Sequence, residues 1–411
     1  MKRSVFVVLV LLLLSSAGTS AGDPVLLNVG GAVAEPSPMA INGMNYGNWM
    51  VLYDLGDYYH ELNIPLLRFP AGNYGDENLL NHRALERFVR AARYLDAEPM
   101  VQQNILQGSP EEAAHWVQVS LDEGWGIRYW FIGNEPDLFA TNRAQPHWTP
   151  EFYANTFRQY AEAIKAVDPE AKVIGPVVTG TPNEVWIKTF LSIAGDVVDI
   201  LAWQWYPSDG SMDREAALAT AVEVRDHMRM FRQWMADPAV NPLGYQRDIP
   251  LFLSEFGLSW RTDHARLLTD MTAALWLAEA WSEMVLEGLD YAAYFALQGT
   301  GGHGLFDAGW FPRPTYFAAW MLAQMGPVWH EVEHGGHRQD MVMYAARDEE
   351  QWSILLVNKR RQAVQVAVPA DTGIVHHWVD DEEQEDLWFR RAGSVIDIPA
   401  YSLNLITFPA D

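Results

Sequence analysis

The sequence predicts an α/β fold in which a (β/α)8 TIM barrel is followed by a small antiparallel β-sandwich. Between residues 39 and 326, short apolar runs alternate with amphipathic stretches, which is the pattern of parallel strands and crossover helices. After Gly326 the helical period is lost, and β-branched runs follow one another with turns between them, as in a sandwich. An open, doubly wound sheet has the same local pattern as the barrel and is the alternative architecture.

The chain has 411 residues, which suits one large unit of roughly 250–300 residues with a small companion. We predict a signal peptide at 1–22, a strand within 23–38 that joins the sandwich, the barrel at 39–326 and the sandwich at 327–411. The signal peptide is predicted from Lys2 and Arg3, the apolar run Val5–Leu14 and the small residues around Ala21. This order is typical of secretion, and the apolar run is shorter than the ~20 residues that span a bilayer. The protein is therefore expected to be secreted, extracellular or periplasmic, without a membrane span.

The barrel is expected to contain eight strands, because eight short runs are almost wholly apolar. The expected strands are Ala40–Met44, Leu66–Phe69, Pro99–Ile105, Ile127–Ile132, Lys172–Val178, Ile200–Tyr206, Pro250–Ser254 and Tyr291–Leu297. The expected helices are Leu85–Leu95, Pro110–Leu121, Phe152–Val167, Val185–Ile193, Arg214–Met235, Ala265–Leu286 and Pro314–Met325. Ser109-Pro110 and Thr149-Pro150 each place a capping residue before a first-turn proline, which marks the start of a helix.

The second domain is expected to be wholly β. Its expected strands are Val342–Ala345, Trp352–Val357, Ala363–Val368, Ile374–Trp378, Ser394–Ile398 and Leu403–Phe408, with Val25–Val29 as an additional strand from the N-terminus. The acidic run Asp380–Asp386 is interpreted as a solvated hairpin loop, with calcium binding as the alternative, because the spacing of a known calcium loop is absent.

Composition excludes several classes of function. The 53 acidic and 28 basic residues give a net charge of −25, which argues against a nucleic-acid partner. Without cysteine there is no thiol nucleophile, thiolate metal site or disulfide. The 12 histidines lack ligand spacing, so we expect no metal and no cofactor. The 18 Trp residues can all be buried in the hydrophobic core, but exposed aromatic rings also bind sugars by stacking on them.

Two glutamates follow buried strands and are the strongest candidates for chemistry. Glu135 follows Phe131-Ile132-Gly133-Asn134, at the end of the fourth strand, and Glu255 follows Leu251–Ser254, at the end of the seventh. Burying an unpaired carboxylate destabilises the folded protein, so its presence at the end of a buried strand suggests a function. The active sites of such barrels lie at this face. Two carboxyl groups across an aromatic-lined cleft are what glycoside hydrolysis needs, one protonated and one ionised. The alternative is a structural role, in which the glutamates only hydrogen-bond neighbours at the rim.

The chain resembles the retaining glycoside hydrolases of clan A. Gly133-Asn134-Glu135-Pro136-Asp137 is similar to the acid/base motif of heparanase-like β-glucuronidases, and Ser254-Glu255-Phe256-Gly257 to the nucleophile strand. The resemblance implies that Glu135 is the acid/base, Asn134 binds the sugar 2-hydroxyl and Glu255 is the nucleophile.

Two further segments resemble arabinofuranosidase-like and xylosidase-like relatives. Arg68-Phe69-Pro70-Ala71-Gly72-Asn73 departs from the relatives' motif in having Ala71 where glycine is usual. Trp203-Gln204-Trp205-Tyr206-Pro207 has Gln204 where histidine is usual, and the resemblance implies that Tyr206 steadies the nucleophile.

The remaining candidates contact either substrate or core. Arg68 is expected to hold a carboxylate ionised or to contact substrate, or else to form a plain ion pair at the rim. Strand alternation places Gln204 and Tyr206 inward and Trp203 and Trp205 outward. Sugar-stacking rings are therefore sought on loops, at Trp148, Trp260 and Trp310.

The sequence thus predicts a secreted retaining O-glycoside hydrolase with an oligosaccharide or polysaccharide substrate, a neutral β-linked sugar being favoured. A uronide hydrolase and a non-catalytic carbohydrate-binding protein on a barrel scaffold are the alternatives. Arg261, Arg313 and His303, near strand ends, are the cations that would favour a uronide. The oligomeric state is left open.

Overall fold

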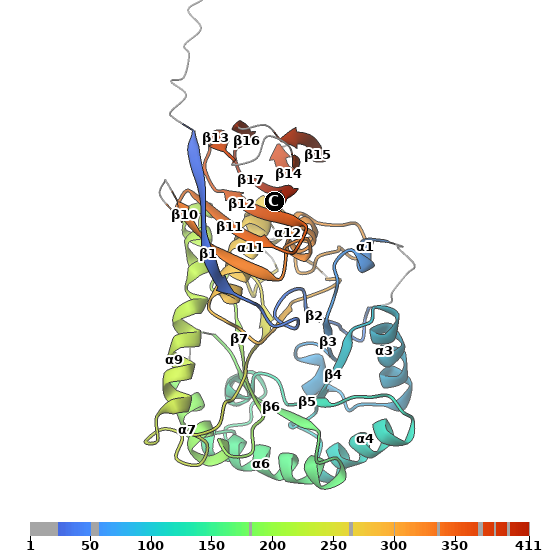
Figure 1. Cartoon of the computed structure of the whole chain (residues 1–411). Helices are drawn as coiled ribbons and strands as arrows, with labels where there is room; N and C mark the ends of the chain where they lie inside the picture. The colour runs from blue at the N-terminus through green and yellow to red at the C-terminus, as the bar shows by residue number, and fades with distance from the viewer. Residues whose placement is uncertain are drawn as a thin grey trace, which may run out of the picture.

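A computed structural model describes residues 24–50, 57–180, 183–262, 266–299, 301–334, 338–368, 373–381, 384–392 and 395–410. The predicted signal peptide lies outside these residues. The chain forms a barrel of strands and helices beside a domain of antiparallel strands (Figure 1). Within the described ranges, no helix has both the length and the apolar character needed to cross a bilayer.

Eight parallel strands close into a barrel in the order of the chain, which confirms the predicted architecture and excludes the open sheet. They are β2 (Met44–Asn45), β3 (Leu66–Phe69), β4 (Glu98–Gln103), β5 (Tyr129–Ile132), β6 (Lys172–Val178), β7 (Ile200–Trp205), β8 (Leu251–Phe256) and β9 (Tyr291–Tyr294).

Only β3 and β6 have the predicted bounds at both ends, and two of the other differences affect the site. The first strand is only two residues long, because Asn42 adopts a left-handed conformation (φ 60°) and its amide donates to the carbonyls of Leu62 and Ala319. The seventh strand, β8, continues to Phe256, so Glu255 lies within the strand and not after it.

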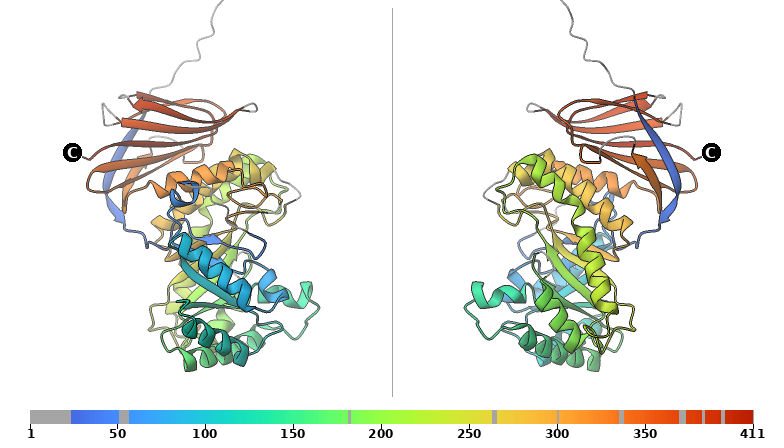
Figure 2. Two further views of the ribbon diagram at one scale, coloured as in Figure 1. Left: turned by 90° about the vertical axis from the view of Figure 1, so that its right-hand side faces the viewer. Right: turned by 90° about the vertical axis from the view of Figure 1, so that its left-hand side faces the viewer.

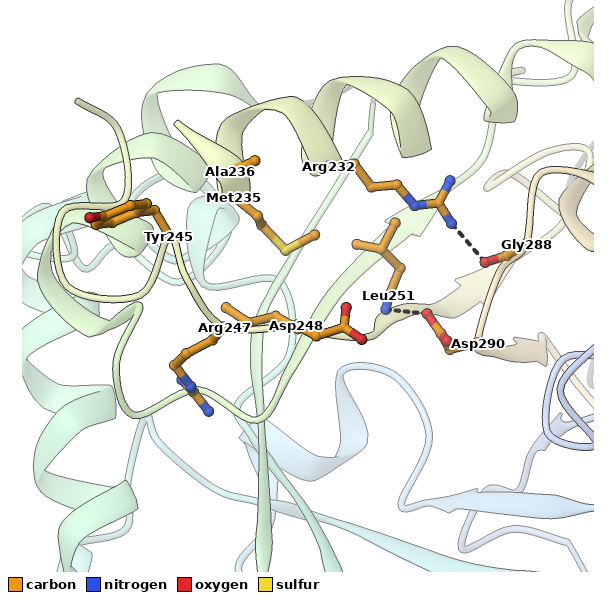
Figure 3. A pocket seen from close by; sticks show the side chains of 10 residues that line it. Arg232, Met235, Ala236, Tyr245, Arg247, Asp248, Leu251, Gly288 and Asp290 are labelled. Carbon is orange, nitrogen blue, oxygen red and sulfur yellow. Dashed lines mark hydrogen bonds between the residues drawn. The ribbon is translucent and has the colours of Figure 1, made fainter. Parts of the chain in front are cut away.

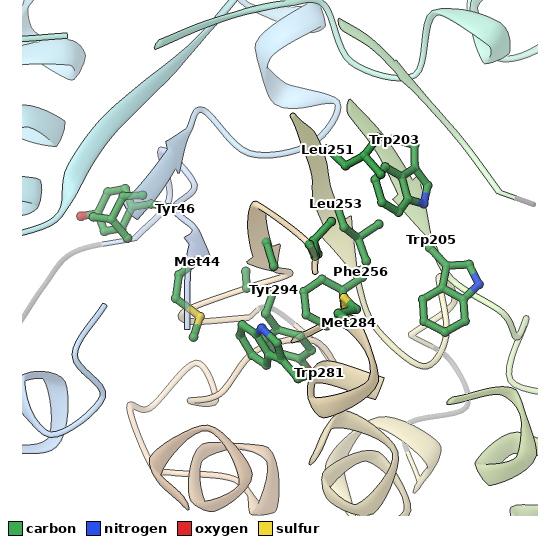
Figure 4. Packing of buried hydrophobic residues seen from close by; sticks show 14 of the residues in the cluster. Met44, Tyr46, Trp203, Trp205, Leu251, Leu253, Phe256, Trp281, Met284 and Tyr294 are labelled. Carbon is green, nitrogen blue, oxygen red and sulfur yellow. The ribbon is translucent and has the colours of Figure 1, made fainter. Parts of the chain in front are cut away.

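The barrel wall separates two apolar cores. Leu66, Met100, Phe131, Ala202 and Phe252 belong to one cluster, as expected for the inner faces of these strands. The opposite faces pack against the helices, as Figure 4 shows for Trp203, Trp205 and Phe256. The rings of Trp203 and Phe231 lie edge to face at 4.9 Å. The assignment of Trp203 and Trp205 to outer packing is therefore confirmed.

The helices follow the predicted order. The longer ones are α3 (His82–Tyr94), α4 (Pro110–Asp122), α6 (Pro150–Val167), α7 (Glu184–Ala194), α9 (Val224–Ala236), α11 (Met271–Leu286) and α12 (Pro314–Ala323). The short ones are α1 (Asp57–His60), α2 (Tyr74–Glu77), η1 (Pro136–Leu138), α5 (Phe139–Asn142), α8 (Arg214–Ala219), η2 (Thr220–Val222) and α10 (Arg266–Thr269).

Both predicted helix starts are confirmed, because the Ser109 hydroxyl accepts from the Glu112 N–H and the Thr149 hydroxyl from the Phe152 N–H, each at 3.2 Å. Two predicted helices are interrupted. Thr220 starts a 3-10 turn and accepts a hydrogen bond from Trp276. Asp270 caps α11 by accepting from the Thr272 N–H, which separates α10 from α11.

In the described residues, the second domain contains nine strands in the order β15-β14-β17-β12-β11-β10-β1-β13-β16. β1 (Val25–Ala34) pairs with β10 on one side and β13 on the other, so the N-terminal strand does join the sandwich. The other strands are β10 (Val328–His334), β11 (Met341–Arg347), β12 (Gln351–Asn358), β13 (Val364–Ala367), β14 (Gly373–Asp381), β15 (Gln384–Ala392), β16 (Val395–Ile398) and β17 (Ser402–Pro409).

Two of these strands were not predicted. β10 carries the polar residues His330, Glu331 and Glu333, and β15 begins within the predicted acidic loop. The loop is therefore shorter than expected, because Asp381 of β14 is the backbone partner of Gln384 of β15 at the end of the hairpin. The acidic side chains lie outside the described residues.

The sandwich rests on the barrel helices α11 and α12 (Figure 2). Along β11, Met343 and Ala345 belong to the sandwich core, whereas Val342 and Tyr344 join the core of the barrel. A buried ion pair crosses this interface, in which Lys359 Nζ lies 2.7 Å from Glu279 Oε2. Burial raises the pKa of Glu279, and Lys359 opposes this rise.

Replacing Lys359 by alanine is expected to lower the free energy of unfolding by about 3 kcal/mol, because it leaves the carboxyl of Glu279 buried and unpaired. Urea denaturation measures the change. Arg361→Ala is the matched control, since it breaks the exposed ion pair with Glu215 and should leave the unfolding midpoint nearly unchanged. Equal effects of the two variants would contradict the prediction.

Candidate active site

The candidate site lies at the carboxyl ends of the barrel strands, where polar side chains from five strands meet. Arg68 is on β3, Gln102 on β4, Gln204 on β7 and Glu255 on β8, and Asn134 follows β5 by two residues. All five are at least nine-tenths buried. Because the strands are parallel, their carboxyl ends form one face of the barrel.

Arg68 is the centre of this group. Its Nη1 atom donates to Glu255 Oε1 at 2.6 Å and to Asn45 Oδ1 at 2.9 Å. Its Nη2 atom donates to Asn134 Oδ1 at 2.7 Å and to Gln102 Oε1 at 3.3 Å. With no exposed surface and four acceptors, the guanidinium is held in one orientation and compensates the negative charge of Glu255.

Both oxygens of Glu255 are engaged. Oε1 accepts from Arg68, and Oε2 accepts from the hydroxyl of Tyr206 at 3.1 Å. The phenol lies in a protein-lined environment, and burial raises its pKa well above the usual range, so it remains a donor. Gln204 contacts the same group, because its Nε2 donates to Asn134 Oδ1 at 2.6 Å.

Glu135 lies on a strained turn. Its backbone is left-handed (φ 48°, ψ 50°), which is unfavourable for a residue with a side chain. The turn persists because the Glu135 N–H donates to the Val177 carbonyl at 3.0 Å and the Gly133 N–H to the Gln103 carbonyl at 3.1 Å. Strain of this kind is concentrated at functional sites.

The electrostatic environment of Glu135 favours its protonated form. Burial raises the pKa of Glu135 well above the usual range, and the charges of Glu255, Asp137 and Asp76 raise it further, against the opposing effect of Arg68. Some of Glu135 nevertheless remains exposed to solvent. The site thus holds one carboxyl paired with a guanidinium and another that favours its proton, which is the division that acid and nucleophile require.

The three tryptophans predicted to stack on a sugar differ in their exposure to solvent. Trp260, on the loop after β8, is 59% exposed and can present a ring face. Trp310 is only 8% exposed and lies edge-on to Tyr59 at 5.7 Å. Trp148 is likewise buried, edge-on to Phe139. Core packing thus covers most of both rings, and Trp260 is the most exposed of the three candidates.

Arg313, considered as a cation for substrate, has a different function in the structure. It is buried and donates to the carbonyls of Gly301, Gly302 and His303. It therefore fixes the loop after β9. His303 lies beside Tyr206, with ring centroids 6.1 Å apart, and burial lowers its pKa to about 4. Neither side chain is available as a free positive charge.

Three residues of the site were not predicted from the sequence. Asn45 and Gln102 bind Arg68, and Asp76 lies behind them on α2. A signal existed for Gln102, which is polar within an apolar run. Nothing in the local pattern distinguished Asp76. Among the described residues, no three His, Asp or Glu side chains gather as metal ligands would.

A pocket of about 310 Å³ lies at the other end of the barrel (Figure 3). It is lined by Leu251, the first residue of β8, and by Asp290, which precedes β9. Two of its polar side chains are paired within the protein, since Arg232 donates to the Gly288 carbonyl and Asp290 accepts from the Leu251 N–H. The pocket is therefore distinct from the site around Glu255.

Comparisons with known proteins agree with this geometry. Residues 85–208 match the family model of glycoside hydrolase family 44. A probable α-L-arabinofuranosidase C of Aspergillus fumigatus is 27% identical over 165 residues, covering 29% of this chain and 31% of that protein. An intracellular exo-α-L-arabinofuranosidase of Bacteroides ovatus is 21% identical over 199 residues, covering 38% and 37%. The chain thus spans about a third of the length of these curated relatives.

Solved structures share the fold over almost the whole chain. An α-L-arabinofuranosidase from Thermotoga maritima superposes with a TM-score of 0.75 at 15% identity, covering 94% of this chain and 100% of that one. A family 44 xyloglucanase from Paenibacillus polymyxa has a TM-score of 0.69 at 12% identity, covering 94% and 100%. The matches confirm the resemblance to retaining glycoside hydrolases of clan A.

Proposed function

We propose that this chain, which resembles the clan A hydrolases, is a retaining O-glycoside hydrolase. In the first step the Glu255 carboxylate attacks the anomeric carbon while Glu135 gives its proton to the departing oxygen. In the second step Glu135, now a carboxylate, takes a proton from water as that water attacks the anomeric carbon and releases Glu255. Arg68 and Tyr206 orient the nucleophile, and Asn134 and Gln204 line the part of the site where the sugar binds.

One observation carries this proposal: the two glutamates share a site but have opposite environments. Glu255 is bound to Arg68 and Tyr206, whereas burial and neighbouring carboxylates raise the pKa of Glu135. A protein that only bound carbohydrate would not need a protonated carboxyl beside an ion-paired one.

We further propose that the substrate is a neutral, β-linked oligosaccharide or polysaccharide. Arg68 and Arg313 are engaged within the protein. Arg261, whose Cζ lies 5.8 Å from the centroid of the Trp260 ring, is a single charge against the acidic groups of the site. The net charge of −25 also disfavours a polyanion, although salt screens that field within ~8 Å. The names of the curated relatives make a neutral α-L-arabinofuranoside the second candidate. Trp260 is the proposed stacking ring.

A panel of substrates tests both the retaining mechanism and the preference for a neutral sugar. We expect hydrolysis of xyloglucan or of an aryl β-glucoside, β-xyloside or α-L-arabinofuranoside, and little hydrolysis of the aryl β-glucuronide. Proton NMR of the first-formed anomer should show retained configuration. An inverted product would contradict the mechanism. A preference for the glucuronide, lost in Arg261→Ala, would contradict the neutral substrate.

We also propose that the protein is secreted, on the basis of residues 1–22. Expression of the full chain in a bacterial host, followed by mass spectrometry of the exported form, should show cleavage near Ala21. Retention of the intact N-terminus in the cytoplasm would contradict this proposal.

A further inference from the structure

Asp137 lies in η1, two residues after the proposed acid/base, and the proposed mechanism does not use it. Its carboxyl group accepts hydrogen bonds from the segment between β6 and α7. The Thr179 N–H donates to both oxygens at 3.2 Å, and the Thr179 hydroxyl donates to Oδ2 at 2.6 Å. Asn183 Nδ2 donates to the same oxygen at 3.4 Å. Asp137 thus joins the turn after β5 to the chain that follows β6.

The two segments that Asp137 joins are both strained. Glu135 (φ 48°) and Val177 (φ 59°) adopt the left-handed region, which is unfavourable for residues with side chains and most of all for a β-branched one. The Glu135 N–H donates to the Val177 carbonyl at 3.0 Å, so the two strained residues are bound to each other. Such conformations persist only where the surrounding structure holds them. Asp137 and Thr179, two residues further along each segment, supply a second connection between the same segments.

A short, rigid piece of chain carries Glu135 and Asp137 together. Pro136, between them, is buried and has a fixed φ angle. The Leu138 N–H donates to the Glu135 carbonyl at 3.0 Å, which closes the 3-10 turn. A displacement of Asp137 is therefore transmitted to the backbone of Glu135.

We propose that Asp137 is a positioning residue for the acid/base: by binding the main chain and the side chain of Thr179, it holds the strained turn of Glu135 against the end of β6. This inference rests on the proposed role of Glu135. Without the connection the turn can relax to an unstrained conformation, and the Glu135 carboxyl then moves away from the departing oxygen. A misplacement of about 1 Å can slow a reaction by about 10²-fold.

The test is the ratio of kcat/KM for two aryl glycosides, one with an activated phenol and one with an unactivated phenol. Because kcat/KM reports formation of the glycosyl-enzyme, it depends on the acid only when the phenol is a poor leaving group. In Asp137→Ala, kcat/KM should fall about 10–100-fold for the unactivated substrate and change by less than about twofold for the activated one. A loss of folded protein would lower both values equally and leave the ratio unchanged.

Two milder variants probe the contact itself and replace Asp137→Ala if that protein does not fold. Thr179→Val removes the hydroxyl but keeps the N–H, and should raise the ratio of activated to unactivated kcat/KM by about two- to tenfold. Asp137→Asn keeps an oxygen acceptor for the Thr179 N–H, and should keep most of the activity that Asp137→Ala loses. Adding Thr179→Val to Asp137→Ala should change the ratio little, because both substitutions remove the same connection.

Asp199→Ala is the matched control. Asp199 also binds β6 through its carboxylate, but at the amino-terminal end of the strand, where Oδ2 accepts from the Val173 N–H at 2.9 Å. It is paired with Lys165 at 2.8 Å. Because this end of the barrel lies opposite the site, the ratio of the two kcat/KM values should stay at that of the wild-type protein.

The outcomes separate this inference from the proposed function. If Glu135→Ala raises the ratio and a folded Asp137→Ala protein does not, the role of Asp137 is overturned while the proposed function stands. If the wild-type protein hydrolyses neither glycoside, or if Glu135→Ala leaves the ratio unchanged, the proposed function fails and the role of Asp137 fails with it.

Discussion

Replacing Glu255 by glutamine is expected to abolish turnover of every substrate, with a loss of kcat of at least about 10⁴-fold. The amide has nearly the same shape but cannot form the bond to the anomeric carbon. A good leaving group cannot compensate, because the first step still needs a nucleophile. Steady-state kinetics on activated and unactivated aryl glycosides measure the loss.

Tyr206→Phe is the control for this variant. It removes the hydroxyl that donates to Glu255 Oε2 but leaves the nucleophile and its ion pair with Arg68. One lost hydrogen bond should reduce kcat by about 10-fold. If Glu255→Gln kept as much activity as Tyr206→Phe, Glu255 would not be the nucleophile.

Replacing Glu135 by alanine should have an effect that depends on the leaving group. With an unactivated phenol we expect a loss of about 10²–10⁴-fold, because no group then protonates the departing oxygen. With an activated phenol such as dinitrophenol, formation of the glycosyl-enzyme should be nearly unaffected. Its hydrolysis should become slow, because no base activates water.

Azide separates the two roles of Glu135. As an anionic nucleophile it needs no base, so it should restore turnover of the activated substrate by Glu135→Ala and give a glycosyl azide of retained configuration. It should not restore Glu255→Gln, which forms no glycosyl-enzyme. Equal losses on both phenols, without rescue, would assign Glu135 a structural role.

Several features of the site could be predicted because they depend on short stretches of chain. Each barrel strand is an apolar run that needs covering on both faces, and a polar residue at its carboxyl end must lie at the common face of the barrel. The position of Glu135, Glu255 and Arg68 on such runs is enough to make them candidates. Strand alternation likewise places Trp203 and Trp205 outside the barrel.

Other features depend on groups that are far apart in the chain. Asn45, Gln102 and Glu255 meet at Arg68 only once eight strands have closed, and the register shifts in β8 decide which way Glu255 points. The residues next to Trp310 predict an exposed ring on a loop. In the structure the ring packs edge-on against Tyr59, which lies some 250 residues earlier in the chain.

The sequence alone is thus enough to predict the order of the barrel strands and of the longer helices and to select the two carboxyls, because the period of apolar residues and the position of a residue on its strand are local properties. Only the tertiary structure decided the environment of those carboxyls. Burial, ion pairing and the strain at Glu135 come from residues on α2, β3, β4, β7 and β8 together, and the free energy of a buried charge is set by all the groups around it.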